Sequence, residues 1–331
     1  MVRVLCSGSF MCDIVAADLP RISEPGELVY APRGIELHVG GHAANVTIDL
    51  SKLGQTGVAA TGGIGDDPLG AFVEAELEGH GVEVHAERPA GFHTAKNLAL
   101  VVRGEDRRFH AELSANTMLS PGHVLRVIEE TRPRAFYQGT VGGMRLIDGR
   151  LNEVLGGARR LGCVTAVDVV MPHEGGWRRL EEALPLVDVF HCNDGEGAAL
   201  TGADDPLVAS ERILRKGVGL CLITMGPGGL LATNGETRLR MPAFKAEAVD
   251  PTGAGDAFCA GVIGAILDSG MDREDLARTP RDALRGILLR GAAAGAACVS
   301  APGATTAMSR EAVDGLIAEQ GDRVWKGAES L

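Results

Sequence analysis

The chain has 331 residues, which allows one large domain or two of ordinary size. Its formal net charge of −12 argues against a protein that binds nucleic acid irrespective of sequence, because such a protein needs a basic surface. Hydrophobic residues make up 45% of the chain and charged residues 23%, which is typical of a folded protein and excludes a disordered one. The 46 glycines follow no three-residue period, so they exclude collagen and predict tight turns or close backbone approaches.

The cysteines and the apolar runs bear on the compartment. The seven cysteines are dispersed and form no Cys-x-x-Cys pair, which predicts reduced, buried thiols rather than a disulfide framework. No stretch approaches the roughly 18 consecutive apolar residues of a membrane span. Residues 1–10 lack the long apolar segment of a signal peptide. We therefore expect a cytoplasmic protein with no membrane partner.

Short apolar runs alternate with longer amphipathic stretches, which is typical of an α/β fold. The first strand is predicted at residues 2–7, and helices are predicted over 45–53, where Gly54 ends the helix, and over 69–77. Later strands are predicted at 135–138, 164–168, 187–191 and 220–225. Each of these later strands follows a helical stretch, so we expect right-handed crossovers onto a mainly parallel sheet.

Two segments interrupt this alternation. Residues 14–38 contain three prolines, and residues 92–113 alternate in polarity around a predicted turn at 104–106. We interpret both as antiparallel excursions that form a small sheet over one edge of the core, a candidate lid. One domain over residues 1–331 with these two lid excursions is therefore expected. The lid also offers a surface through which two copies could form a homodimer.

The most informative stretch runs from Val249 to Phe258 and contains Gly253-Ala254-Gly255-Asp256. It is predicted to be a turn that leads into the first residues of a helix, where unpaired N–H groups and the helix dipole form an anion site. Asp256 is then placed to accept a proton from a hydroxyl while the anion site holds a phosphoryl group. Taken alone, the stretch also allows a simpler interpretation, in which Asp256 only caps the helix.

A second stretch, Gly40-Gly41-His42-Ala43-Ala44-Asn45, opens the first predicted helix. Paired glycines let a small ligand approach the backbone, and the Asn45 amide can donate to and accept from a hydroxyl. Taken alone, this stretch is better interpreted as an ordinary loop and helix start.

Together, the two stretches resemble the two signatures of the ribokinase family, also called the pfkB carbohydrate kinases. Further matches follow in family order: Asp13 after the first strand, the turn at 62–70, Asn193-x-x-Glu196, the Thr-x-Gly-x-x-Gly run from Thr224 to Gly229, and Pro302-Gly303-Ala304. The resemblance covers essentially the whole chain. It implies a ribokinase-like three-layer α/β/α core with a mainly parallel sheet and a small β lid.

The resemblance also implies an activity and a set of site residues. The implied reaction is transfer of the γ-phosphoryl group of ATP to a hydroxyl of a small sugar or polyol. Asp256 is implied as the base, with the amides of Gly253, Ala254, Gly255 and Asp256 as the anion hole; Asp13, Gly41 and Asn45 as substrate ligands; and Asn193, Thr224, Gly226 and Gly229 as nucleotide ligands. Glu196 with Asn193 is implied to orient Mg²⁺ through water. Asp250, Thr252 and Gly303, with carbonyls near Cys298, are implied to hold a monovalent cation, expected to be K⁺.

Some features narrow the possibilities. None of the five lysines follows a glycine, so a P-loop kinase is excluded. Asp168 is present, but Val170 and Pro172 stand where many sugar-acid and fructose kinases have Asn and Arg. This departure argues against a carboxylated sugar and puts a fructokinase in doubt. His191, beside Cys192, is interpreted as a packed strand end rather than a metal ligand.

Two alternatives stay open on the sequence alone. One is a nucleoside kinase on the same fold, and the other is a non-catalytic protein that senses a sugar or a nucleotide.

Overall fold

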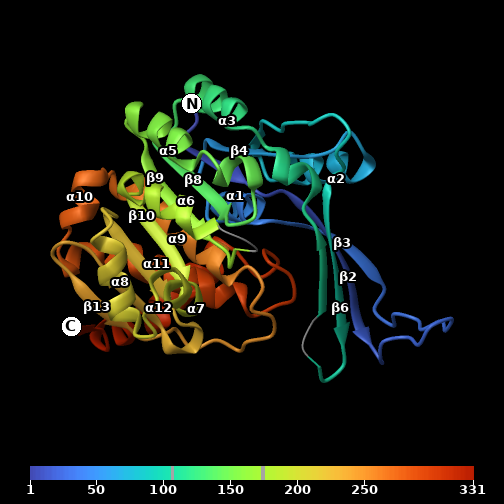
Figure 1. The fold of residues 1–331 in the computed structure, drawn as a ribbon. Coiled ribbons are helices and arrows are strands. Elements are labelled where there is room, and N and C mark those ends of the chain that lie inside the picture. The colour runs from blue at the N-terminus through green and yellow to red at the C-terminus, as the bar shows by residue number, and fades with distance from the viewer. Residues whose placement is uncertain (106–107, 173–175) are drawn as a thin grey trace.

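A computed structural model describes residues 1–105, 108–172 and 176–331 (Figure 1). Asp106, in the predicted turn at 104–106, lies outside the described residues. The strands form two sheets, one of ten strands in the order β14-β13-β12-β11-β10-β9-β8-β1-β4-β5, and one of four strands in the order β3-β2-β6-β7.

The large sheet is parallel from β5 to β11 and antiparallel beyond β11. Its strands are β1 (Val4–Gly8), β4 (Val58–Gly62), β5 (Glu83–Val84), β8 (Ala135–Val141), β9 (Val164–Val169), β10 (Val189–Asn193), β11 (Leu220–Thr224), β12 (Leu230–Thr233), β13 (Arg238–Met241) and β14 (Glu329–Ser330). All the core strands predicted from the sequence are present, with ends shifted by a few residues. Because parallel strands are buried on both faces, their sequences are continuous apolar runs, which is why they could be found.

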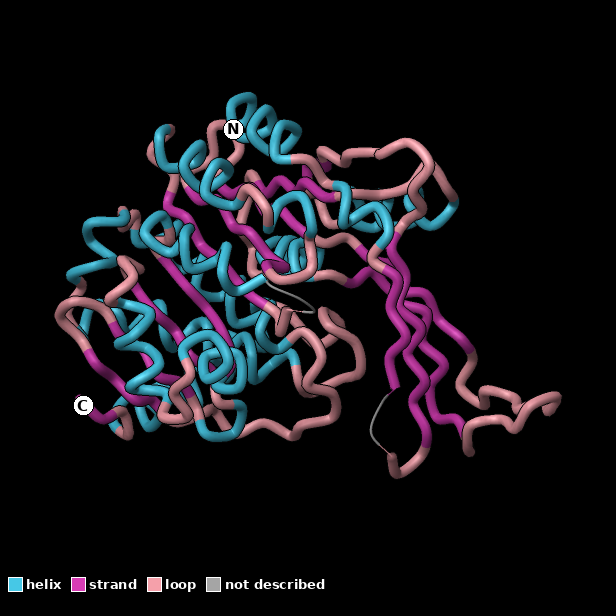
Figure 2. Tube along the Cα trace, in the orientation of Figure 1, coloured by secondary structure: helices cyan, strands magenta, loops and turns pink. Residues whose placement is uncertain are grey.

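Helices cover both faces of this sheet (Figure 2). They are α1 (His42–Lys52), α2 (Pro68–Gly79), α3 (Pro121–Thr131), α4 (Arg145–Asp148), α5 (Leu151–Arg160), α6 (Gly176–Ala183), α7 (Asp194–Thr201), α8 (Pro206–Leu214), α9 (Ala254–Ser269), α10 (Arg273–Arg278), α11 (Arg281–Cys298) and α12 (Arg310–Lys326), with short 3₁₀ turns η1 (Ser114–Met118), η2 (Leu184–Leu186) and η3 (Gly226–Gly228). None of the helices in the described ranges is long and apolar enough to cross a membrane.

Alternation along each strand separates two apolar cores. In β1, Val4 and Cys6 join the core that contains residues of α1, α9 and α11. Leu5, between them, joins the core that contains residues of α3, α5 and α8. Successive side chains of a strand point to opposite faces, so this division defines a three-layer α/β/α architecture.

The second sheet, which we call the lid sheet, extends away from the core (Figure 1). It contains β2 (Met11–Leu19), β3 (Ile35–Gly40), β6 (Ala95–Val102) and β7 (Arg108–Glu112). The pairs β2–β3 and β6–β7 are antiparallel, but β2 pairs with β6 in parallel, so the expectation of a wholly antiparallel sheet is wrong at this join. The reason is topological: a parallel join needs a long crossover, and the stretch from α1 to β5 supplies it.

Candidate active site

The N-terminus of α9 forms the centre of the candidate site. Gly253 precedes the helix with a left-handed backbone, φ 78°, and a Cβ there would lie 2.5 Å from the carbonyl oxygen of Ala304. Only glycine fits this position without strain. Among the described residues, no side chain caps the helix. Gly253, Ala254 and Gly255 therefore present a helix N-terminus that is suited to an anion.

Asp256 lies in the first turn of α9 and is 6% exposed. It does not cap its own helix. Instead, Asn45 of α1 donates from Nδ2 to Asp256 Oδ2 at 2.7 Å. Burial raises the pKa of Asp256 to about 6, although the nearby His42 imidazole and the Asn45 hydrogen bond oppose the rise. A buried, oriented carboxyl with a pKa near neutrality is suited to proton transfer.

Beneath Asp256 lies a network that sequence reasoning missed. Asp168, at the end of β9 and 2% exposed, accepts a hydrogen bond at Oδ1 from the backbone N–H of Val169 at 2.9 Å, and the same oxygen lies 2.8 Å from His191 Nδ1. His191 Nε2 lies 3.1 Å from Thr224 Oγ1 on β11. Burial opposes ionisation of Asp168, but His191 and His42 outweigh it and lower the pKa of this carboxyl below its usual range.

His42 joins this network to Asp256. Its Nδ1 lies 3.3 Å from Asp168 Oδ2 and 3.5 Å from Asp256 Oδ1. Burial disfavours the charged imidazole, but the carboxylates of Asp256 and Asp168 outweigh burial and raise the pKa of His42 to about 10. Positions 42, 168 and 191 follow no common spacing, so only the position of His42 directly after the two glycines could have marked it.

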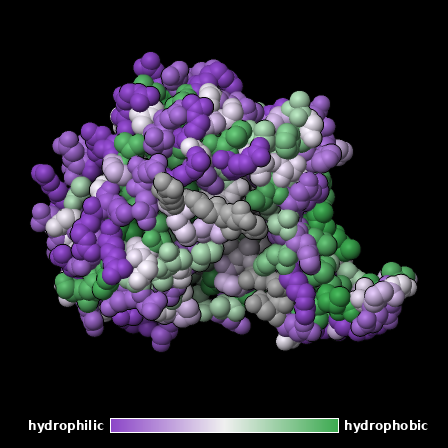
Figure 3. All heavy atoms as spheres, in the orientation of Figure 1, coloured by the Kyte–Doolittle hydropathy of each residue, from purple (hydrophilic) through white to green (hydrophobic). Residues whose placement is uncertain are grey.

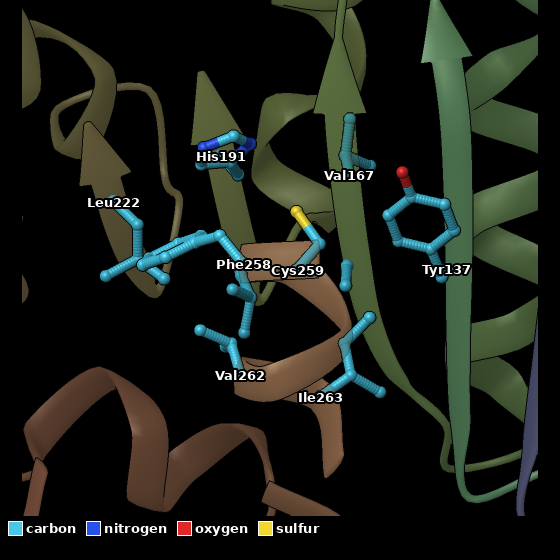
Figure 4. A pocket seen from close by; sticks show the side chains of 10 residues that line it. Tyr137, Val167, His191, Leu222, Phe258, Cys259, Val262 and Ile263 are labelled. Atoms are coloured by element: carbon cyan, nitrogen blue, oxygen red, sulfur yellow. The ribbon is translucent and has the colours of Figure 1, made fainter. Parts of the chain in front are cut away.

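His191 is buried at 5% exposure and its ring packs on Phe258 with 5.1 Å between centroids. Figure 4 shows it beside a cavity whose labelled lining includes Tyr137, Phe258 and Cys259. The cavity has a volume of about 10 Å³, enough for a single water at most. We therefore interpret it as packed interior beneath the site.

The predicted acceptor ligands come from β2 and from the start of α1. Asp13 lies on β2, Gly41 precedes α1 with φ 94°, and Asn45 is on the first turn of α1. A Cβ on Gly40, at the end of β3, would lie 2.2 Å from Asp13 Oδ2, so Asp13 packs directly against the diglycine. The lid sheet and the start of α1 thus bring these residues to one place. Burial raises the pKa of Asp13, and a hydrogen bond with Asn97 opposes the rise.

The predicted nucleotide ligands lie at the neighbouring ends of β10 and β11, where Asn193 and Thr224 are in register. Asn193 and Glu196 cap α7 reciprocally: Asn193 Oδ1 accepts from Glu196 N, and Glu196 Oε2 accepts from Asn193 N, both at 2.8 Å. Glu196 has a second carboxylate oxygen, which fits a water-mediated contact to Mg²⁺. Gly226 and Gly229 turn the chain after β11, and a Cβ on Gly229 would lie 2.0 Å from Met241 O.

The predicted cation ligands join two loops. Asp250 accepts from Thr252 N through Oδ1 at 2.9 Å and from Gly303 N through Oδ2 at 3.0 Å. Cys298 Sγ lies 3.4 Å from Thr252 O and 3.1 Å from Ala304 O. This assembly of carbonyl and carboxylate oxygens, next to the N-terminus of α9, has the donor chemistry that a hard monovalent cation takes.

Comparisons with known proteins identify the family. Residues 1–311 match the family described as pfkB family carbohydrate kinase. A probable fructokinase-7 of Arabidopsis thaliana is 27% identical over 330 residues, covering 95% of this chain and 92% of the relative. Fructokinase-1 of Oryza sativa subsp. japonica is 31% identical over 247 residues, covering 69% of this chain and 72% of the relative.

Solved structures agree in fold. A fructokinase with bound ATP from Xylella fastidiosa superposes with a TM-score of 0.81 at 23% identity, covering 96% of this chain and 98% of that one. A ribokinase from Thermotoga maritima gives 0.78 at 23% identity, with 96% and 100% coverage. The chain therefore belongs to the pfkB family of carbohydrate kinases and has the ribokinase-like fold. The predictions of family, fold and enzyme class, a phosphotransferase with an alcohol acceptor, are confirmed.

Proposed function

We propose that this carbohydrate kinase transfers the γ-phosphoryl group of ATP to a hydroxyl of a small, neutral sugar or polyol, with Asp256 as the base. The observation that carries this proposal is the carboxyl of Asp256, buried and held by Asn45 beside the uncapped N-terminus of α9. In this arrangement a hydroxyl at Asp256 faces a phosphoryl group at the amides of Gly253, Ala254 and Gly255.

The steps follow from the chain's own groups. Asp13, Gly41 and Asn45 orient the acceptor hydroxyl, and Asp256 takes its proton as the oxygen attacks. Thr224, Gly226 and Gly229 hold the ATP phosphates and ribose, because no lysine follows a glycine to do so. Asn193 and Glu196 would hold Mg²⁺ through water, and the ion supplies charge neutralisation at the phosphates. Closure of the lid sheet would exclude water from the transfer.

The charge of the acceptor region favours a neutral substrate. Asp13 and Asp256 both present carboxylates there, and a third carboxylate, of Asp168, shares the His42 imidazole with Asp256. A carboxylate or phosphate group on the sugar would be repelled by these carboxylates. A site that binds such an anionic group usually supplies an arginine. Val170 and Pro172 stand after Asp168 where such a residue would come.

A substrate panel tests the proposal. ATP consumption and thermal stabilisation are measured with fructose, ribose, a polyol, a 2-dehydro-3-deoxy sugar acid, fructose 6-phosphate and a nucleoside. We expect a neutral sugar or polyol to give both consumption and stabilisation. Consumption with the nucleoside alone identifies a nucleoside kinase. Stabilisation without any consumption identifies a sensor.

We also propose that a monovalent cation, K⁺, binds at Asp250, Thr252 and Gly303 and orders the loops beside the anion hole. The support is that the Asp250 carboxylate, which accepts from Thr252 N and Gly303 N, joins the two loops and supplies a negative charge there. Activity in K⁺ should exceed activity in Na⁺ at equal ionic strength, and indifference to the ion would contradict the site.

A second copy of the chain is the partner we propose for the lid sheet. Leu37 of β3 and Leu98 of β6 both pair with Ile14 of β2, so they share one face, and they are 45% and 39% exposed. Figure 3 shows apolar surface gathered on the lid sheet beside the polar surface of the core. An exposed apolar face of this kind favours association.

We place the reaction in the cytoplasm, which the seven unpaired, buried cysteines support.

A further inference from the structure

We infer that the protein has a site for a zinc-type divalent cation, formed by His42 Nδ1, Asp168 Oδ2 and Asp256 Oδ1, and that its occupation inhibits the kinase. This site is separate from the Mg²⁺ position proposed at Glu196. Binding of the cation does not depend on the proposed function, whereas the inhibition rests on Asp256 being the base.

The separations of the ligand atoms fit a tetrahedral metal. His42 Nδ1 lies 3.3 Å from Asp168 Oδ2 and 3.5 Å from Asp256 Oδ1, and one ligand atom from each of the three residues lies within 4.8 Å of the others. Zinc bonds to nitrogen and oxygen of roughly 2.0–2.2 Å give tetrahedral edges of about 3.3–3.6 Å. Both separations from His42 Nδ1 fall in this range, so one ion can lie between the imidazole and the two carboxylates.

The orientation of the two carboxylates is fixed by their other oxygens, which already accept hydrogen bonds from neighbouring residues. Asp168 Oδ1 is engaged by His191 at 2.8 Å and Val169 N at 2.9 Å, and Asp256 Oδ2 by Asn45 at 2.7 Å. Asp168 Oδ2 keeps one lone pair beside its bond from Tyr137 at 3.2 Å. His42 Nδ1 and Asp256 Oδ1 are buried without a hydrogen-bond partner among the described residues. Metal-ligating carboxylates are typically fixed by such outer hydrogen bonds.

A neighbouring cluster, Asp168 with His191 and Cys259, is the weaker candidate. There, Asp168 Oδ1 and His191 Nδ1 already lie 2.8 Å apart and engage each other. Burial also raises the pKa of the Cys259 thiol well above its usual value, so a thiolate ligand is costly. In the cluster of His42 the separations from Nδ1 are longer, 3.3 and 3.5 Å, and leave room for an ion between the groups.

The ligand chemistry selects the class of ion. One imidazole nitrogen and two carboxylates suit Zn²⁺ or Co²⁺, whereas Mg²⁺ favours six oxygens and keeps its waters. Two carboxylates also neutralise the charge of a divalent ion. Binding uses the unprotonated Nδ1 of the imidazole and both carboxylates, so the affinity for the cation is expected to rise with pH.

Occupation removes the proposed base. The Asp256 Oδ1 lone pair bonds to the cation, so this oxygen no longer accepts the proton of an acceptor hydroxyl. The fourth position of the ion remains for water. Zinc-type ions are therefore expected to lower turnover, and a chelator is expected to restore it.

The first test is spectroscopic and uses the full chain without nucleotide or sugar. Co²⁺ is titrated into the metal-free protein, followed by Zn²⁺ in competition. We expect one Co²⁺ per chain with the intense visible bands of a four-coordinate ion, displaced by Zn²⁺, and no thiolate charge-transfer band. His42→Ala and Asp256→Asn should weaken binding by at least about tenfold. His80→Gln, a histidine at the end of α2 that contacts none of the three ligands, should bind as the wild type does.

Several outcomes overturn the inference: no four-coordinate spectrum in the wild type, equal affinity in His42→Ala, or a thiolate band that points to Cys259. His42 begins a helix and its side chain is 27% exposed, so alanine there is compatible with folding, which a melting curve checks. A kinase assay in Mg·ATP with added Zn²⁺ then tests inhibition. Binding without inhibition supports the site but contradicts Asp256 as the base, so the two failures are distinguishable.

Discussion

The core site and the lid sheet are built in opposite ways. In the core site the carboxyl of Asp256 is buried, and one of its oxygens is already held by a hydrogen bond from Asn45 at 2.7 Å. On the lid sheet the apolar groups are exposed, with Ile35 at 64% and Leu37 at 45%. The core therefore carries preorganised chemistry, whereas the lid needs a further surface to complete it.

The apolar clusters explain this difference. Among the described residues, the lid sheet has one small buried cluster of its own, Ala16, Leu19 and Val102. The core strands are covered by helices on both faces. A single sheet without a covering layer is marginal in water, so its geometry depends on what it contacts. Substitutions in the core site should therefore change chemistry, and substitutions on the lid should change association.

The largest effect is expected from Asp256→Asn. The amide keeps the volume and the contact with α1 but cannot take a proton, so turnover should fall by roughly 10²- to 10⁴-fold. Binding of ATP, measured by calorimetry, should persist because Asp256 is on the acceptor side. Asp268→Asn, on the exposed end of the same helix, is the matched control. Near-normal turnover of Asp256→Asn would remove Asp256 from the role of base.

Gly253→Ala should have the next largest effect. The residue has φ 78°, and the added Cβ would lie 2.5 Å from Ala304 O, so the anion hole must distort at a cost of about 1–3 kcal/mol. We expect a lower melting temperature and weaker ATP binding. The control is Gly286→Ala in α11, where a Cβ meets nothing within 4 Å. That variant should be neutral or slightly more stable, and equal behaviour of the two would contradict the strain argument.

The same comparison shows what the sequence could predict. Gly253, Gly255 and Asp256 lie within four positions in the chain, so a local pattern was enough to place them together at a helix start. Five of the parallel strands, β1 and β8 to β11, were equally visible because each contains a short apolar run, whereas β4 and β5 were not predicted. Local requirements of backbone conformation and burial leave such short-range signals.

The buried network around Asp168 could not be predicted from such local patterns. His42, Asp168 and His191 come from a helix start and two strand ends, and only the order of strands in the sheet brings them together. The parallel pairing of β2 with β6 was missed for the same reason, because the sequence of neither strand indicates which strand it pairs with. Interpreting His191 as a packed strand end described its burial but not its hydrogen bonds to Asp168 and Thr224.

The pH dependence of kcat/KM gives a smaller but sharper test of the core. Burial raises the pKa of Asp256 to about 6, and only its ionised form takes a proton. Activity should therefore be constant above that pH and fall as pH drops through it. The His42 imidazole lowers the pKa of Asp256. His42→Ala should therefore raise this pKa and move the acid limb to higher pH. The profiles are measured with a chelator present, and an acid limb that moves to lower pH in His42→Ala contradicts the arrangement.

The smallest effect on the isolated chain is expected on the lid. Leu37 and Glu36 are neighbours on β3 that point to opposite faces of the lid sheet, so Leu37→Lys places a charge on the apolar face and Glu36→Lys places it on the other face. An exposed substitution changes the free energy of unfolding by about 0.5 kcal/mol or less.

If a second copy covers the apolar face, Leu37→Lys should still shift the sedimentation profile from dimer to monomer, and Glu36→Lys should not. The melting temperature of the wild type should then rise with protein concentration, and that of Leu37→Lys should not, because association stabilises only a chain that can associate. A wild-type protein that sediments as a monomer at every concentration would leave the lid to be completed by substrate alone.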